Sequence, residues 1–379
     1  MSKTKILIVC SFGESLMNFR GDFIKALVEE NFEVFCAAPY IKSATRKMLE
    51  EWGAHYDNFP LQRTGMNPLK DIGSIRVLGQ LMDKHEIDIV FPYTIKPVIY
   101  SSIAAGKRKI PVVSLITGLG FTFSAISPKA KLLQNVTQIM YRYALKFNQT
   151  VIFQNIDDQA LFKEKNIING KSKSYVVNGS GINLNKYKFR ERKIAENSKV
   201  KFVLAGRLMP EKGVGLFIKA AETLKSNNIQ AEFHLFGSVA KQYESSPFEK
   251  ELNRLAANKT VILHGHVDNV AVKLDEMDVF VLPTYYREGV PRSILEALSS
   301  GMPVITTNTP GCRETVIPDK NGFLLPPQEL DPLIEAMQFF IENPSRIPEM
   351  GKNSFHLAKE KFDVHLINKQ LISLIRESI

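Results

Sequence analysis

The sequence predicts an α/β protein with two Rossmann-like, doubly wound parallel sheets in tandem, facing a cleft. The chain has 379 residues, whereas a single hydrophobic core usually stops growing at about 250–300 residues. Short apolar runs alternate with amphipathic helical patterns about every 25–30 residues, which is typical of parallel strands joined by helices. A polar, charged connection at 183–198 separates two such sets of elements.

The first set begins with a short apolar run from Lys5 to Ser11, as expected of a parallel strand that is buried on both faces. An amphipathic helix follows and extends to about Glu30. Further strands are predicted at 33–38, 88–93, 112–117, 150–154 and 174–177. Helical patterns separate most of these strands, so we expect a first domain of residues 1–182.

The second set repeats the alternation, and we expect it to form a domain of residues 183–355. Its strands are predicted at 200–205, 232–236, 261–264, 278–283 and 303–306, and its helices at 214–225, 247–256, 291–300 and 330–342. The tail is strongly amphipathic, and residues 356–379 are expected to form a helix that packs back on the first domain. Such sheets bind ligands at the carboxyl ends of their strands, so the cleft between the two halves is the expected site.

The composition is that of a soluble enzyme. Hydrophobic residues make up 44% and charged residues 23% of the chain, which excludes a disordered, collagenous or coiled-coil protein. Cys10, Cys36 and Cys312 are too few and too far apart for a disulfide framework or a zinc site, and they indicate a reducing compartment. The first apolar run is too short for a secretory signal, so we expect a cytoplasmic protein.

Positive charge is concentrated in the first half of the chain. The formal net charge is +10, of which residues 1–185 contribute +8, and residues 89–156 contain no Asp or Glu. The candidates for contact with an acidic partner are Lys107, Arg108, Lys109, Lys129 and Lys131. Interleaved aromatic residues favour an anionic membrane surface. Nucleic acid and an ordinary solvated basic face are the alternatives.

The densest group of candidate binding residues lies at 284–296. Glu288 falls in the loop after a predicted strand, Pro291 stands where a first helical residue should be, and Glu296 lies one to two turns into the helix. The free N–H groups of a helix N-terminus suit an anion such as a diphosphate. Carboxylates beside it can accept hydrogen bonds from sugar hydroxyls, although such a pair taken alone is more often two solvated surface glutamates.

Two cations, Arg207 and Lys212, follow the first strand of the second domain, at its carboxyl end. Fixed positive charges there can neutralise a diphosphate leaving group without a metal. Two other strand exits carry His234 and the pair His264 and His266, which we expect to share one strand face. Two histidines without a third ligand seldom hold a metal, and the chain contains no Asp-x-Asp. We therefore expect no metal site.

Together these segments resemble the family 4 glycosyltransferases, nucleotide-sugar-dependent enzymes with the GT-B fold. The matching segments are A-G-R-L-M-P-E-K-G (205–213), E-G-V-P-R-S-I-L-E (288–296), G-M-P-V-I (301–305), N-G-S-G (178–181) and P-G-C-R-E (310–314). The resemblance implies a retaining transferase in which Arg207 and Lys212 hold the donor diphosphate and Glu288 contacts the donor sugar. It implies no cofactor besides the donor substrate.

The same resemblance assigns further donor-binding residues. Glu296 is expected on the ribose, Val267 near the nucleobase, and the backbone of Gly289 and Val290 near the sugar and phosphate. The rest of the implied donor-binding set is Gly13, Gly206 and Ser293.

Two departures from the family pattern lie in the first domain. Its first loop has Gly13 in place of a Gly-Gly pair, and Thr117 and Gly118 stand at a strand exit, on the acceptor side, where many members carry a histidine. No general base is therefore assigned. In retaining members the leaving phosphate is thought to take the acceptor proton.

Segments 64–68 (T-G-M-N-P) and 310–314 make the chain similar to bacterial O-antigen and capsule enzymes. These enzymes extend sugars on undecaprenyl diphosphate at the cytoplasmic face of the inner membrane, often from N-acetylhexosamine donors. The implied donor is a UDP-sugar, and the implied acceptor is a polyisoprenyl-diphosphate-linked sugar. The implied location is peripheral on an anionic membrane, with no nucleic acid partner. The positive first half fits such an acceptor.

Three alternatives stay open. A UDP-sugar epimerase or an inverting transferase could share the fold, although the pair Glu288 and Glu296 argues against both. A basic nucleic-acid-binding protein would explain the charge but leaves Arg207 and Lys212 without a role. A silent sugar-nucleotide binder would bind UDP without turnover. The sequence does not specify the donor sugar, the acceptor sugar, the linkage or the oligomeric state.

Overall fold

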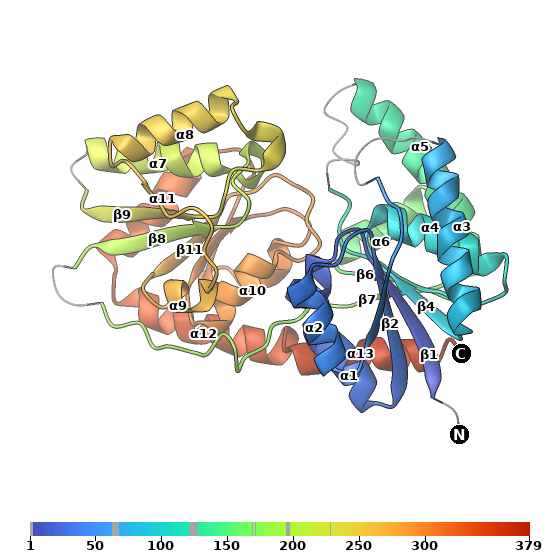
Figure 1. The fold of residues 1–379 in the computed structure, drawn as a ribbon. Coiled ribbons are helices and arrows are strands. Elements are labelled where there is room, and N and C mark those ends of the chain that lie inside the picture. The colour runs from blue at the N-terminus through green and yellow to red at the C-terminus, as the bar shows by residue number, and fades with distance from the viewer. Residues whose placement is uncertain are drawn as a thin grey trace. The chain divides into compact units, whose positions relative to one another are not determined.

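A computed structural model of the chain describes residues 3–62, 68–120, 128–168, 170, 172–194, 198–227 and 229–379. Figure 1 shows the fold as two α/β units. The first unit contains Met1–Ser180 and Val364–Ile379, and the second contains Gly181–Asp363. Each unit is built on parallel strands, so the predicted fold class of two doubly wound sheets is confirmed.

The first unit has a central run of parallel strands. One sheet has the order β3-β2-β1-β4 and a second has the order β5-β6-β7, and two parallel bridges join β4 to β5. The strands are β1 (Thr4–Val9), β2 (Phe32–Ala38), β3 (His55–Asn58), β4 (Ile89–Pro92), β5 (Val113–Ile116), β6 (Thr150–Phe153) and β7 (Lys173–Val176). In register, Thr4 of β1 pairs with Phe32 of β2, and Val9 pairs with Ala37.

Alternation along β1 explains why both faces of this sheet are covered. Ile6 and Ile8 belong to a core shared with α1 and α13, whereas Leu7 and Val9 belong to a second core shared with α3, α4 and α5. The helices of the unit are α1 (Glu14–Glu29), α2 (Ser43–Glu51), α3 (Pro68–His85), α4 (Ile95–Gly106), α5 (Pro128–Ala144), α6 (Ile156–Glu164) and α13 (Val364–Arg376).

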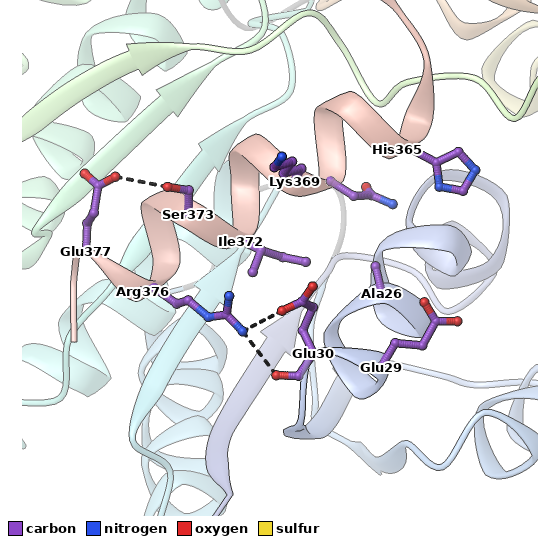
Figure 2. Close-up of a pocket in the computed structure, with 10 residues that line it drawn as sticks. Ala26, Glu29, Glu30, His365, Lys369, Ile372, Ser373, Arg376 and Glu377 are labelled. Atoms are coloured by element: carbon purple, nitrogen blue, oxygen red, sulfur yellow. Dashed lines mark hydrogen bonds and ion pairs between the residues drawn. The ribbon is translucent and has the colours of Figure 1, made fainter.

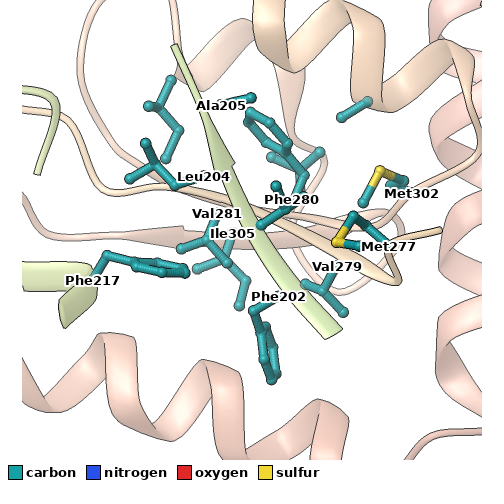
Figure 3. Packing of buried hydrophobic residues seen from close by; sticks show 14 of the residues in the cluster. Phe202, Leu204, Ala205, Phe217, Met277, Val279, Phe280, Val281, Met302 and Ile305 are labelled. Carbon is teal, nitrogen blue, oxygen red and sulfur yellow. The ribbon is translucent and has the colours of Figure 1, made fainter. Parts of the chain in front are cut away.

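The second unit has one six-stranded parallel sheet with the order β10-β9-β8-β11-β12-β13. The strands are β8 (Val200–Ala205), β9 (Ala231–Phe236), β10 (Ile262–Leu263), β11 (Val279–Leu282), β12 (Val304–Thr307) and β13 (Gly322–Leu325). Figure 3 shows the core around β8, where Phe202 and Leu204 lie among side chains from β11 and β12. The apolar runs of the central strands follow from this burial on both faces.

Helices cover both faces of the second sheet (Figure 1). Helices α7 and α11 pack together, and helices α10 and α12 pack together. The helices are α7 (Val214–Ser226), α8 (Pro247–Ala257), α9 (Val270–Leu274), α10 (Arg292–Ser299), α11 (Asp331–Glu342) and α12 (Arg346–Lys361). A short 3-10 helix, η3 (Pro210–Lys212), stands between β8 and α7.

Two strands were not predicted from the sequence. Strand β3 has the polar sequence His-Tyr-Asp-Asn with two exposed and two half-buried residues, so it shows no apolar run. Strand β13, Gly-Phe-Leu-Leu, has four residues and begins at a glycine, which disfavours strands. Both lie at the end of a sheet, where one side of the strand is left without a partner and the sequence constraint is weaker.

The connection predicted at 183–198 is not a free linker where the structure describes it. Arg192 is only 4% exposed and donates hydrogen bonds to the carbonyls of Met277 (2.8 Å), Leu274 (3.0 Å) and Ser300 (2.6 Å). Burial lowers the pKa of Arg192 to about 10. The side chain therefore ties this segment to the second unit by satisfying carbonyls at the ends of other elements.

The tail predicted at 356–379 is divided between the two units. Helix α12 continues to Lys361 within the second unit, and α13 begins at Val364 in the first. The amide of Ile182 donates to the carbonyl of Phe362 at 2.8 Å, and Ile182 forms a parallel bridge with Asp363. These bonds hold residues up to Asp363 with the second unit, which moves the boundary from residue 355 to residue 363.

The strand orders locate the place where ligands are expected in each unit. In the first unit β1 lies between β2 and β4, and in the second β8 lies between β9 and β11. Successive strands are added to the sheet first on one side of these central strands and then on the other. The loops at their carboxyl ends therefore diverge and leave a crevice. The candidate residues should therefore follow β1 and β4, and β8 and β11.

Candidate functional site

The centre of the candidate site is an ion pair between Lys212 and Glu288. Lys212 ends η3, just after β8, and Glu288 lies in the loop after β11. The Nζ atom of Lys212 contacts Oε1 of Glu288, and the two side chains are only 11% and 15% exposed. Residues 76 positions apart in sequence are thus joined in a poorly solvated setting, where charges act more strongly than in water.

Glu211 holds the loop of Lys212 against the loop of Glu288. Its carbonyl accepts hydrogen bonds from the hydroxyl of Thr284 (2.9 Å) and the amide of Tyr285 (3.0 Å). Its carboxylate accepts a hydrogen bond from the hydroxyl of Tyr243. The backbone of η3 is therefore bonded directly to the exit of β11, which restricts where the Lys212 amine can lie.

Glycines allow the strand exits of the second unit to approach one another. Gly213 has a φ of +76°, and a Cβ there would stand 2.1 Å from the carbonyl oxygen of Pro283. A Cβ on Gly237, where φ is +134°, would stand 1.8 Å from the carbonyl oxygen of Gly206. Only glycine tolerates both the dihedral angle and the contact. The result is close packing of the backbone at the exits of β8, β9 and β11.

A third close approach supports the loop of Glu288 itself. A Cβ on Gly311, where φ is +84°, would stand 1.6 Å from the carbonyl oxygen of Gly289. The loop after β12 therefore lies directly on the backbone at 288–289. Cys312 behind it is fully buried, and burial raises the pKa of its thiol to about 12, so the thiol stays neutral and serves packing.

Glu296 lies inside α10 and has partners of its own. Its Oε1 accepts a hydrogen bond from the hydroxyl of Tyr187 (2.8 Å) and contacts Nε of Arg292 (3.3 Å). The side chain is 13% exposed. Burial raises the pKa of Glu296, although the bonds from Arg292 and Tyr187 oppose that rise. The carboxylate is therefore oriented and only partly solvated, as a hydroxyl-binding group should be.

The amino end of α10 differs by one residue from the prediction. Pro291 is the N-cap, with φ of −63° and ψ of 117°, and the helix begins at Arg292. Ser293 is half-buried in its first turn, and Gly289 and Val290 before it are buried. The first N–H groups of a helix lack intrahelical acceptors, so this turn can bind an anion near Glu288.

Arg207 shares the exit of β8 with Lys212, and Val267 lies after β10. Arg207 is exposed in the loop after β8, next to Gly206, and its position leaves it accessible to a ligand. Val267 is half-buried and lines a hollow of about 360 Å³ together with His266 and Asn269. The structure thus joins Lys212 to Glu288, while Glu296 has a separate set of contacts.

The histidines at the strand exits pair differently from the prediction. His264 and His266 were expected on one strand face, but β10 ends at Leu263 before either residue. Instead, Nδ1 of His234 lies 3.0 Å from Nε2 of His264 with the rings stacked, and His266 contacts Asp268. Burial lowers the pKa of His234 and of His264, which favours a neutral pair in which one ring nitrogen donates and the other accepts.

Within the described ranges, no group of three or more His, Cys, Asp or Glu side chains could hold a metal ion. Over the same residues, no helix combines the length and apolar character needed to cross a bilayer.

In the first unit, Gly13 follows β1 and caps α1. A Cβ on Gly13 would stand 2.3 Å from the carbonyl oxygen of Tyr40, so glycine is needed for this close packing. Thr117 and Gly118 are half-buried just after β5. These residues lie at strand exits of one sheet edge, which is where the switch-point rule places a ligand.

Thr94, at the exit of β4, is a further candidate that the sequence did not reveal. Its φ is +72°, which is strained for a β-branched residue, and its buried hydroxyl has no hydrogen-bond partner among the described residues. Such strain concentrates at ligand sites, but no sequence pattern predicts a positive φ at a threonine. Tyr187 was also missed, because its contact with Glu296 spans 109 residues.

The basic residues predicted for an acidic partner separate into two kinds. Lys107 and Lys109 are exposed after α4, and Lys131 is exposed on α5. Arg108 instead bonds Asp83 through Nε and Nη2, both at 2.7 Å, so its charge is largely neutralised within the unit. The side chain of Lys129 and segment 64–67 lie outside what the structure describes.

A separate hollow of about 630 Å³ lies between α1 and α13. Figure 2 shows Arg376 of α13 donating to the side chain of Glu30 (2.6 Å) and to its carbonyl (3.3 Å). Glu30 lies two residues before the start of β2 and therefore at the amino edge of the sheet, opposite the strand exits. The hollow thus marks how α13 is anchored on the first unit rather than a part of the candidate site.

Comparison with known proteins agrees with these features. The family model "Glycosyl transferases group 1" matches residues 185–356, and the model "Glycosyl transferase 4-like" matches residues 5–155. In Campylobacter jejuni, the N,N'-diacetylbacillosaminyl-diphospho-undecaprenol alpha-1,3-N-acetylgalactosaminyltransferase is 26% identical over 373 residues, with 96% of each chain covered.

In Escherichia coli, the UDP-Gal:alpha-D-GlcNAc-diphosphoundecaprenol alpha-1,3-galactosyltransferase is 29% identical over 279 residues, covering 71% of this chain and 70% of the other. Among solved structures, Anabaena HepE in complex with UDP has a TM-score of 0.77 at 20% identity, covering 99% of this chain and 100% of the other. At that identity the likeness establishes a shared fold.

Proposed function

Because the chain belongs to the group 1, family 4 glycosyltransferases, which retain the anomeric configuration, we propose that it transfers a hexose or N-acetylhexosamine from a UDP-sugar to a polyisoprenyl-diphosphate-linked saccharide. Its relatives are undecaprenyl-linked and capsule glycan transferases. The observation that carries the proposal is the buried ion pair of Lys212 and Glu288. It joins a cation suited to a diphosphate to a carboxylate suited to sugar hydroxyls.

The donor residues have distinct roles in this proposal. Lys212 and the exposed Arg207 neutralise the diphosphate, and the N–H groups at the start of α10 solvate its oxygens. Glu288 accepts hydrogen bonds from the sugar, and Glu296 accepts them from the ribose. Val267 lies beside the nucleobase. The phosphate and the sugar approach the backbone of Gly206, Gly289 and Val290 closely. Ser293 belongs to the first turn of α10.

The reaction balances without a protein base. The bond between the anomeric carbon and the β-phosphate oxygen breaks, and a bond from the same carbon to an acceptor oxygen forms on the same face. The acceptor proton passes to the departing phosphate oxygen. Lys212 and Arg207 stabilise the negative charge that develops on UDP, which is where preorganised charges contribute most. In the first unit, Thr117 and Gly118 border the acceptor, and Gly13 belongs to the donor-binding set.

The acceptor assignment rests on charge and on the relatives. Both relatives named above are, by name, transferases to a sugar on diphospho-undecaprenol. The first half of this chain carries +8 of the net charge, with no Asp or Glu at 89–156. Such a region attracts both a diphosphate and an anionic bilayer. The protein would therefore work as a peripheral protein at the cytoplasmic face of the membrane.

The test is UDP release from a panel of UDP-sugars, with and without an undecaprenyl-diphosphate-linked N-acetylhexosamine. We expect acceptor-dependent release with one or a few donors, an α-linked product, and turnover that persists in EDTA. Loss of turnover in EDTA would contradict the metal-free mechanism. Acceptor-independent conversion of the UDP-sugar would identify an epimerase or hydrolase, and a β-linked product would identify an inverting transferase.

A further inference from the structure

Helix α5 of the first unit exposes a row of large apolar side chains. Leu132 is 66% exposed, Ile139 is 61% exposed and Tyr143 is 52% exposed. The ring of Tyr143 packs edge-on against Phe147, and a Cβ on Gly106 at the end of α4 would touch the Phe147 ring. The row is therefore held on a helix that is packed firmly beneath it.

The row occupies one side of the helix. At about 100° per residue, Leu132, Ile139 and Tyr143 fall within about 40° of one another. Thr137, Tyr141 and Ala144 lie on the opposite side and are buried in the unit. A helix with one face buried and an apolar row on the other still has apolar surface to cover.

Positive charge surrounds this row. Lys131 and Lys146 are exposed at its two ends, and Arg142 is exposed beside it, with its guanidinium donating to the carbonyls of Asn166 and Lys165. Lys107 and Lys109 follow α4, whose last residue, Gly106, packs on Phe147. Residues 89–156, to which these side chains belong, contain no Asp or Glu.

We propose that this face of α5 docks in the plane of an anionic lipid bilayer, with Leu132, Ile139 and Tyr143 entering the interface and the flanking lysines contacting headgroups. Apolar side chains rimmed by lysine on a helix parallel to the surface are the chemistry of interfacial binding. The inference rests on the proposed function to the extent that a polyisoprenyl-linked acceptor must be met in a membrane. The proposed docking element is therefore α5 and not Arg108, because Arg108 is paired with Asp83.

The first experiment measures binding to vesicles of phosphatidylglycerol and phosphatidylethanolamine by co-sedimentation. The variant Leu132→Ser/Ile139→Ser should bind at least tenfold more weakly than the wild-type chain, because it removes the two aliphatic side chains of the row and leaves every charge. Ile156→Ser on α6 is the matched control, since Ile156 is also 66% exposed, and it should bind as the wild type does. Vesicles of phosphatidylcholine alone should bind all three weakly.

Two results would overturn the inference. One is a double variant that binds anionic vesicles as tightly as the wild type, or no more weakly than Ile156→Ser. The other is a wild-type chain that dimerises in light scattering and becomes monomeric in the double variant while vesicle binding is unchanged, which would make the face a contact between copies. A tryptophan introduced as Ile139→Trp adds a direct readout, because its emission should shift to the blue on vesicles and stay unshifted in solution.

Turnover assays separate this inference from the proposed function. With a short-chain, water-soluble polyisoprenyl-diphosphate sugar, the double variant should work as fast as the wild type. With a long-chain acceptor in vesicles, it should be at least fivefold slower. If the wild type turns over neither acceptor yet binds vesicles through α5, the proposed function fails and the docking face stands. If turnover on vesicles is equal in both proteins, the docking face fails alone.

Discussion

Charged residues in the two units work under opposite conditions. In the second unit, Lys212 and Glu288 form a contact pair with side chains 11% and 15% exposed. In the first unit, Lys107, Lys109 and Lys131 are exposed to solvent. Coulomb interactions near 4 Å are worth about 1 kcal/mol in water and several times more in a poorly solvated site. The difference predicts specific, geometric effects in the second unit and weak, additive ones in the first.

The two sets also differ in how they are held. Glu211 and close glycine packing hold the loops of Lys212 and Glu288, so the charges are preorganised before a ligand arrives. The exposed lysines of the first unit keep their side-chain freedom, and salt screens them over a Debye length of about 8–10 Å. A substitution in each unit should therefore leave a different signature in turnover, stability and salt dependence.

The largest effect is expected from Lys212→Ala. Removing one preorganised contact to a leaving group lowers the rate by about 10²–10³-fold, mainly through kcat, as measured by UDP release. Lys219→Ala on α7 is the matched control, because Lys219 is exposed, and it should be unchanged. Equal turnover of Lys212→Ala and Lys219→Ala would remove Lys212 from the mechanism and with it the comparison between the units.

The second-largest effect is expected from Gly311→Ala, which acts by disrupting the packing of the backbone and not by changing a charge. Its Cβ would meet the carbonyl oxygen of Gly289 at 1.6 Å, and the φ of +84° disfavours alanine. We expect a loss of about 2–4 kcal/mol in the free energy of unfolding, with lowered turnover because the Glu288 loop must shift. Gly215→Ala has open space around the new methyl and should change stability by less than about 1 kcal/mol. Denaturant titration of both variants compares them directly.

Glu296→Gln should raise the KM for the UDP-sugar about tenfold, because neutral hydrogen bonds to the ribose replace charge-assisted ones. The same substitution should stabilise the folded protein relative to the wild type, although it weakens binding of the donor. The folded pKa of Glu296 is raised above 4.5, chiefly by burial, so the wild type loses stability as the pH rises from 4.5 through the folded value. The glutamine cannot ionise, so the free energy of unfolding of the variant should increase relative to that of the wild type across that pH range.

Urea titrations at acidic and neutral pH test this sign, with the exposed residue change Glu335→Gln on α11 as control. A stability difference between Glu296→Gln and the wild type that does not grow with pH would show that Arg292 and Tyr187 fully offset the burial of the carboxylate.

The smallest effect is expected from single lysines of the first unit. Lys107→Ala should weaken binding to anionic vesicles about fivefold at low salt, corresponding to about 1 kcal/mol per lysine near the headgroups, and the difference should vanish in high salt. Arg108→Ala should have less effect on vesicle binding, because Arg108 is already paired with Asp83. The reverse order in co-sedimentation would show that the Asp83 pair opens at the membrane.

Much of the fold could be predicted from the sequence because the sequence shows apolar strand runs that alternate with amphipathic helical patterns. Residues 4–9 and 200–205 are apolar runs because strands buried on both faces have no solvent side. Polar edge strand β3 lacked that signal, and the division of the tail at Asp363 depends on hydrogen bonds to Ile182. Arg207, Lys212 and Glu288 were recognised by their positions after predicted strands, where the parallel topology gathers loops on one edge. The other donor residues were assigned from the family resemblance.

The sequence by itself determined the two sheets, the donor motifs and the excess of positive charge in the first half, because each follows from local composition and spacing. Only the tertiary structure decided that Lys212 meets Glu288, that Tyr187 orients Glu296, and that Arg108 is neutralised by Asp83. It also decided that Leu132, Ile139 and Tyr143 stay exposed on α5. Contacts between distant residues depend on how loops and helices pack, and no local pattern records that packing.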